Sequence, residues 1–391
     1  ITKLFGRVPR TKSNEQVVAE LDLLYDLGWR GSVFMVDDNF IGNKKEAMRV
    51  LPPIAEWQAA RKFPFSLSTE ASVNLVEIDG MIGAMVAAGF EMVFLGIETP
   101  NLEALLTTKK GQNVKKGEDH YLLRAVRIIQ AGGMEVSAGF ILGLDGDTEN
   151  AFDSQIDFIQ EAGIPMAIVN ILTVLKGTDL YRRLESEGRL HGDSTTNSMD
   201  MIVNFIPELD SQVLLSGFKR VIGTLYDPRL KNYFERCLAF YEHLGYQHRP
   251  RPSEFRRKIT YTMMVQALRH VFTRKGFTSL LFLARTACRH PTMMAEAVSH
   301  VARGIHFREI TRQTIAADAF RERLRRYYEE LATMASGELR EEMRAHVRMR
   351  AEELIDSAMH EYKRLHTKVG HGIEDALDSF IRSVRPYVSV Q

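Results

Sequence analysis

The sequence is poor in cysteine. Its 391 residues include only Cys237 and Cys288, which are far apart and have no metal-ligand spacing. This excludes a disulfide framework and is typical of a reducing compartment, so we expect a cytoplasmic protein. It also predicts that no metal is held by residues of this chain.

Long hydrophobic runs are also missing. The apolar run at 279–284 is far too short to span a bilayer. We expect no signal peptide in this sequence, which starts at Ile1 within a polar stretch that contains Lys and Arg. We therefore expect the natural polypeptide to begin further upstream.

The net charge is small, at +1, but it is unevenly distributed. Residues 248–391 contain 26 Lys and Arg against 17 Asp and Glu, a balance of +9, which leaves −8 for the rest of the chain. A basic C-terminal half can face an anionic partner such as a phosphate, a lipid headgroup or an acidic domain. The simpler alternative is a solvated helical surface, and nothing in the pattern indicates nucleic acid.

Short apolar runs that end in polar residues are the main positive feature. They predict strands at 32–36, 64–69, 91–97, 134–143 and 165–172, with helical segments between them. This alternation is typical of βα units in a parallel sheet, and ligands bind where such strands end. After residue 200 only helical patterns follow. We therefore predict an α/β domain at 1–200 and a helical domain at 201–391.

Carboxylates recur at the predicted strand ends. Asp37, Asp38 and Asn39 are consecutive, and Glu70 and Glu98 each follow an apolar strand. Such a group could hold an ammonium, a divalent cation or a ribose, whereas a single Asp would more often cap a turn. Carboxylates on neighbouring strands favour a binding site, but they supply no reactive group.

Glycines stand at alternate positions of one predicted strand. The segment Gly139–Gly143 lacks the spacing and the Lys of a phosphate-binding loop. Glycine at such positions lets a group such as a flat ring approach the backbone.

Four segments, Ile1–Ser13, Val36–Asn43, Thr69–Ser72 and Gly96–Thr99, resemble radical S-adenosylmethionine (SAM) enzymes. More narrowly, they resemble the cobalamin-binding group that includes hopanoid C-2 methylases. The resemblance covers about residues 1–200, and the helical remainder is similar to that group's C-terminal extension. It implies a partial (β/α)6 barrel, here without its first strand.

The resemblance also implies cofactors and partners. SAM, a [4Fe–4S] cluster and cobalamin are expected, with the cluster-binding cysteine loop and the cobalamin domain upstream of Ile1. The expected reaction cleaves SAM to a 5′-deoxyadenosyl radical and methylates an unactivated carbon of a small molecule or lipid. An electron donor such as ferredoxin or flavodoxin is implied, and contact with the inner membrane is an open alternative to a purely cytoplasmic location.

Roles for single residues follow from the same resemblance. Asp37, Asp38 and Asn39 match the motif that binds the methionine ammonium of SAM, and Glu70 and Glu98 match contacts to the ribose and methionyl moiety. The residues that match the strands and loop around the adenine are Gly139, Ile141, Gly143, Asn170 and Leu175. Arg7 and Arg10 match positions that could neutralise the SAM carboxylate or the cobalamin phosphate. The segment 109–113 matches a loop on the substrate side.

Two rival interpretations remain open. The first is a non-catalytic protein that keeps a SAM-like pocket and serves as a scaffold or partner-binding module. The second is a sugar- or metal-processing barrel in which the carboxylates act directly, which predicts dependence on a divalent metal.

Overall fold

A parallel sheet of five strands forms the centre of the computed structural model, which describes residues 11–107, 113–115, 118, 120–191, 203–248, 276–336, 341–369 and 373–388. The strands pair in chain order, each parallel to the next. They are β1 (Ser32–Met35), β2 (Ser66–Ala71), β3 (Phe90–Glu98), β4 (Glu135–Leu142) and β5 (Met166–Ile171). The predicted parallel α/β class is therefore confirmed.

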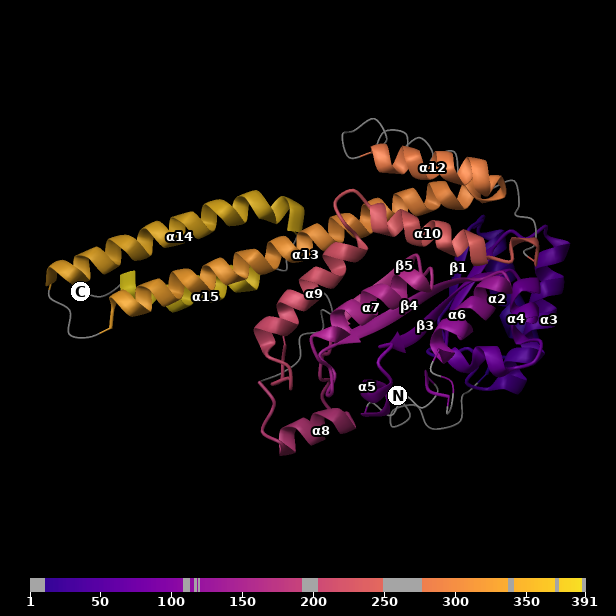
Figure 1. Ribbon diagram of the computed structural model, residues 1–391, viewed down its shortest axis with the longest axis horizontal. Coiled ribbons are helices and arrows are strands. Elements are labelled where there is room, and N and C mark those ends of the chain that lie inside the picture. Colours follow the sequence, from indigo (N-terminus) through magenta and orange to yellow (C-terminus); the bar gives the residue numbers. More distant parts are fainter. Residues whose placement is uncertain are drawn as a thin grey trace. The chain divides into compact units, whose positions relative to one another are not determined.

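Helices connect the strands and contact the sheet (Figure 1). The helical elements up to β5 and directly after it are α2 (Asn14–Asp26), α3 (Lys44–Ala60), η1 (Val73–Glu77), α4 (Met81–Ala87), α5 (Leu102–Thr107), α6 (Tyr121–Ala131), α7 (Asn150–Glu161) and α8 (Asp179–Ser186). Capping residues mark the N-termini of some of these helices. Ser13 and Gln16 form a capping box before α2, and the Asn43 side chain accepts from the Glu46 amide before α3.

The helical C-terminal region is also as predicted. Its elements are α9 (Ser211–Leu225), α10 (Lys231–His243), η3 (Tyr246–His248), α12 (Phe277–Arg289), η4 (Pro291–Met293), α13 (Met294–Met334), α14 (Glu341–Val369) and α15 (Glu374–Val388). None of the helices in the described part of the chain is long and apolar enough to cross a membrane.

The chain forms two compact units, and the division between them differs from the boundary that we expected between residues 200 and 201. The first comprises 1–192 and 203–306, and the second comprises 193–202 and 307–391. Helices α9 and α10 contact β5 or the helices α6 and α7, and α12 contacts α10, so all three belong to the first unit. The buried Arg236 guanidinium of α10, for example, donates to the Gln160 side chain at 2.6 Å and to the Pro165 carbonyl at 3.3 Å.

The second unit has its own hydrophobic core, made by the later part of α13 together with α14 and α15. Phe320, Leu354 and Phe380 are among its buried side chains. An ion pair joins Arg323 to Glu361, so charged groups as well as apolar ones hold these helices together.

The two faces of the sheet differ in burial. On β3, Val93, Leu95 and Ile97 are fully buried, whereas the residues alternating with them are partly exposed. Side chains of a strand point alternately to opposite faces, so this pattern defines one covered face and one more open face. We call the second the open face.

The open face is closed at the start of β4 by buried charges. Arg303 of α13 donates to both carboxylate oxygens of Glu135, at 2.6 and 3.0 Å. His300 lies 3.4 Å from the same carboxylate, and its Nδ1 is 2.6 Å from the Tyr241 hydroxyl. Although burial opposes ionisation, Arg303 and His300 hold the pKa of Glu135 far below its usual value. Any ligand on this face must therefore lie toward the carboxyl ends of the strands.

The edge strand β5 is protected by one tyrosine. The buried hydroxyl of Tyr226 accepts from the Ala167 amide at 3.1 Å and donates to the Ala167 carbonyl at 2.8 Å. An unpaired strand edge exposes such groups, and this contact satisfies two of them at once.

We expect Tyr226→Phe to destabilise the protein, because it leaves two buried backbone groups unpaired. The loss in the free energy of unfolding should be about 1–3 kcal/mol, measured by urea denaturation. Tyr181→Phe, which removes a partly exposed hydroxyl on α8, is the control and should change little. Equal effects of the two changes would contradict this role for Tyr226.

Candidate functional site

Four of the predicted site residues lie on the open face of the sheet. Glu70 of β2 pairs with Phe94 of β3, and Ile141 of β4 pairs with Asn170 of β5. Gly139 lies two residues before Ile141 and therefore points to the same face. The structure thus collects on one surface residues that are up to 100 positions apart in the sequence.

The loop after β1 is fastened to β2. The Phe40 amide donates to the Glu70 carbonyl at 2.9 Å. The Asn39 side-chain oxygen accepts from the Ser72 amide at 3.1 Å, and its Nδ2 donates to the Ser72 hydroxyl at 3.2 Å. Asn39 therefore positions the loop through Ser72, and its neighbours Asp37 and Asp38 are held beside the end of β2.

Three carboxylates repel one another at this point. Burial, and then the charge of Asp38, raise the pKa of Asp37. The same two causes, in the same order, raise the pKa of Glu70. Three acidic groups held this close favour a cationic ligand, because a positive charge among them would relieve the repulsion.

Glu98 ends β3 in a strained conformation. Its φ is +68°, in the left-handed region that residues with a side chain rarely adopt. The pairing with β4 shifts there, so that Gly96 and Glu98 face consecutive residues of β4 and Ile97 is an extra residue, as in a β-bulge. Asn113 fixes this bend by donating to the carbonyls of Gly96 and Ile97, at 2.9 Å each. Strain of this kind concentrates at functional sites.

Gly139 in β4 and Gly143 directly after β4 are glycines for two different structural reasons. A side chain at Gly139 would lie 3.1 Å from the Phe94 ring, so the flat group that approaches this glycine is the protein's own phenyl ring. Gly143 has φ +87°, and a side chain there would lie 2.9 Å from Leu214 of α9. The backbone conformation and the packing against Leu214 therefore explain why residue 143 is a glycine. Gly139 lies on the open face and stays a candidate for contact with a ligand.

Asp147 lies near the predicted site residues but was not itself predicted from the sequence. Its carboxylate accepts from the amides of Gly143 and Leu144, at 2.9 and 3.0 Å, and only 6% of the residue is exposed. Burial raises the pKa of Asp147 to about 6. The available signal was an Asp four residues after a glycine at a strand end, which is typical of a side chain that closes a turn.

The adjacent Asp145 has a structural role. It forms ion pairs with Arg189, at 2.9 Å, and with Arg183. Burial opposes its ionisation, but the two arginines lower the pKa of Asp145 below its usual value. Asp145 therefore anchors α8 and the segment after it.

Some predicted residues are not brought into this group. Leu175 lies in the loop after β5 and is 56% exposed. Arg7, Arg10 and residues 109–112 lie outside the described residues, although Asn113 of the same predicted segment is described above. Within the described ranges, no three His, Cys, Asp or Glu side chains form a group that could hold a metal ion.

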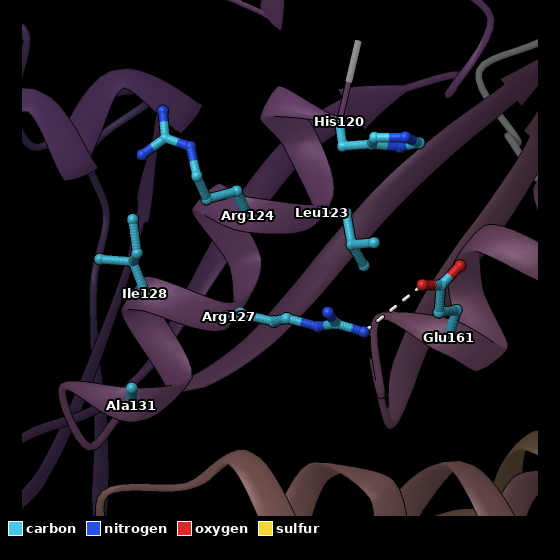
Figure 2. Close-up of a pocket in the computed structure, with 7 residues that line it drawn as sticks. All are labelled: His120, Leu123, Arg124, Arg127, Ile128, Ala131 and Glu161. Atoms are coloured by element: carbon cyan, nitrogen blue, oxygen red, sulfur yellow. Dashed lines mark hydrogen bonds and ion pairs between the residues drawn. The ribbon is translucent and has the colours of Figure 1, made fainter. Parts of the chain in front are cut away.

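A separate pocket lies on the helical layer and not at the strand ends. Figure 2 shows its lining, which comes from α6 and the residue before it and from the last residue of α7. It has a volume of about 600 Å³, and Arg127 and Glu161 form an ion pair of 3.4 Å at its border. None of the predicted site residues lines it.

Comparison with known proteins shows that about 60% of this chain is similar to methyltransferases. It is 40% identical to an uncharacterized methyltransferase of Synechocystis over 246 residues, which are 63% of this chain and 45% of that protein. It is 38% identical to the hopanoid C-2 methylase of Rhodopseudomonas palustris over 236 residues, 60% of this chain and 43% of that enzyme. The chain thus spans less than half the length of these relatives. The predicted resemblance to hopanoid C-2 methylases is confirmed.

Two further matches are less specific. A domain of unknown function, DUF4070, matches residues 178–319. The structure of TsrM from Kitasatospora setae, a radical SAM methyltransferase with cobalamin and a [4Fe–4S] cluster bound, has a TM-score of 0.42 and 13% identity, and covers 76% of this chain and 56% of that one. At this distance it adds nothing to the assignment of the site.

We expect the backbone strain at Glu98 to be measurable by comparing two variants. Glu98→Gly and Glu98→Ala both remove the carboxylate, but only glycine adopts φ +68° without strain. Glu98→Gly should therefore be more stable than Glu98→Ala by about 1 kcal/mol in urea denaturation. Equal stability would contradict a strained Glu98.

Asp147 should make stability depend on pH. Its pKa is about 6 in the folded protein and near 3.8 when unfolded, so the folded state binds more protons between these values. The free energy of unfolding should therefore fall as pH rises from about 4 to about 6, by up to about 3 kcal/mol. Denaturation at several pH values should show a smaller fall in Asp147→Asn; an unchanged fall would refute this assignment.

Proposed function

We propose that this chain is the SAM-binding barrel and helical extension of a cobalamin-dependent radical SAM methyltransferase that methylates an unactivated carbon. The relatives at 38–40% identity, one of them a hopanoid C-2 methylase, support this reaction class and a lipid such as a hopanoid as the substrate. The observation that carries the proposal is the placement of Asp37, Asp38 and Glu70 at the strand ends, where burial and then the charge of Asp38 raise the pKa values of Asp37 and Glu70.

The methionyl ammonium of SAM fits this carboxylate group. An ammonium offers three N–H donors, and hydrogen bonds from a cation to carboxylates are stronger than neutral ones. Its charge would offset the repulsion among the three acids, so binding should lower the pKa values of Asp37 and Glu70. The loop held by Asn39 and Ser72 fixes the acids before the ligand arrives, which limits the entropy lost on binding.

The rest of the open face suits the nucleoside part of SAM. Glu98 would accept from ribose or methionyl groups at the bent end of β3. Gly139, Ile141 and Asn170 would line the adenine, with the Phe94 ring beside Gly139 as one wall. In this arrangement the chain binds and orients SAM and keeps water from it.

The cysteines of this chain do not fit the cluster. Three thiolates are needed to leave one iron of a [4Fe–4S] cluster open to SAM, and the chain has two cysteines. Cys237 is buried in α10, where burial raises the pKa of its thiol to about 12, and Cys288 is exposed on α12. We therefore assign only SAM binding to these residues, with the cluster, cobalamin and the electron donor belonging to the whole enzyme.

Removing one carboxylate should weaken SAM binding. In the full-length enzyme, Asp38→Ala should raise the Kd for SAM by about 10- to 100-fold, because one charge-assisted interaction is lost. Calorimetry gives the Kd. Asp157→Ala, on the exposed surface of α7, is the control and should leave it unchanged.

Other outcomes would favour other functions. Unchanged SAM affinity in Asp38→Ala would overturn the assignment of the ammonium site. SAM binding without methyl transfer in the loaded full-length protein would favour the non-catalytic scaffold. Activity that requires a divalent metal and no SAM would favour the metal-processing barrel.

A further inference from the structure

The helix α12 is folded with its apolar side outward. Phe277, Leu280 and Leu281 are 69, 50 and 48% exposed, and Ala284 is exposed one turn later. These residues follow the i, i+3, i+4, i+7 spacing of one helix face. An amphipathic helix normally buries such a face, so its exposure needs a partner.

The opposite side of α12 packs on α10. Ser279, Phe282 and Thr286 are buried, and the Phe282 ring stacks on Phe234 with centroids 4.5 Å apart. Two of the three inward residues are hydroxyl-bearing, and the Thr286 hydroxyl donates to the Phe282 carbonyl at 2.9 Å. The orientation of α12 is therefore fixed by the stacked rings and by the hydrogen-bonded Thr286 hydroxyl, which leaves the apolar stripe outside.

The sequence around the apolar stripe is basic, and one side of the stripe carries arginines. From Phe255 to Ala295 the sequence has no Asp or Glu and eight Lys or Arg. On α12 itself, Arg285 and Arg289 lie on one side of the stripe; Arg285 pairs with Glu235, and Arg289 is exposed in the last turn. An apolar stripe bordered on one side by an exposed cation favours a surface that is itself apolar below and anionic above.

We infer that the outer face of α12, formed by Phe277, Leu280, Leu281 and Ala284 with Arg289 at its border, docks on the surface of an anionic lipid bilayer. A second copy of the chain would also cover apolar side chains, but an acid-free basic segment offers no charges to attract an identical basic segment. Figure 1 shows α12 at the edge of the first unit, with α10 beside it. The helix would lie in the plane of the interface, because its 13 residues are too few to span.

Sedimentation with lipid vesicles tests this inference with the 391-residue chain. Vesicles of phosphatidylglycerol and phosphatidylcholine should bind the protein, and pure phosphatidylcholine vesicles should bind it much less. Leu280→Asp with Leu281→Asp should lower the partition constant by at least about tenfold. Arg289→Gln should lower it by about three- to fivefold, and added salt should reduce that difference.

The matched control places the same change on another helix. Leu23 of α2 is 60% exposed, so Leu23→Asp adds a negative charge at a similarly exposed leucine and should leave vesicle binding unchanged. Circular dichroism checks that each variant folds. Absence of binding to anionic vesicles, or equal binding by the α12 variant, would overturn the inference. A dimer seen by sedimentation velocity and lost in that variant would instead assign the face to a second copy.

This inference can fail separately from the proposed function. Vesicle binding is measured without SAM, and the α12 substitutions lie on a helix that carries none of the residues assigned to SAM. A chain that binds SAM but not vesicles would leave the methyltransferase proposal standing, and the reverse result would leave only the docking surface.

Discussion

Parallel pairing of five consecutive strands is the constraint on which the site depends. Because each strand runs in the same direction as its neighbours, the residues that end β1, β2 and β3 meet at one edge of the sheet. The two-residue period of a strand then selects which of them share a face. Glu70 belongs with Gly139 and Asn170 for this reason, and the carboxylates of the first loop complete the group.

The two ends of the open face use charge in opposite ways. At the start of β4, Arg303 pairs with the Glu135 carboxylate. Glu135 is therefore ionised and has its counter-charge within the fold, without a ligand. Near the end of β2, Asp37 and Glu70 have raised pKa values because burial and Asp38 disfavour their charges. The first arrangement is complete in itself and stabilises the fold, whereas the second is improved by a bound cation. This contrast, more than the number of acids, favours the carboxylate edge as the ligand site.

Much of the fold was predictable because it follows local rules. Strand positions followed from apolar runs, and they agree with the structure within a few residues. Contacts between distant segments were not predictable. The packing of Leu214 against Gly143 and the left-handed Glu98 depend on tertiary contacts that leave no periodic signal. The outward apolar face of α12 was missed for a related reason, since periodicity indicates an amphipathic helix without saying which side is buried.

The central claim is that the carboxylates at the end of β1 and β2 hold the ammonium of SAM. A crystal structure of the full-length enzyme with SAM bound tests it most directly. We expect the methionyl nitrogen within hydrogen-bond distance of Asp37 or Asp38, with the adenine along β4 and β5. SAM bound elsewhere, for instance in the pocket on α6, with the three acids facing only water, would contradict it.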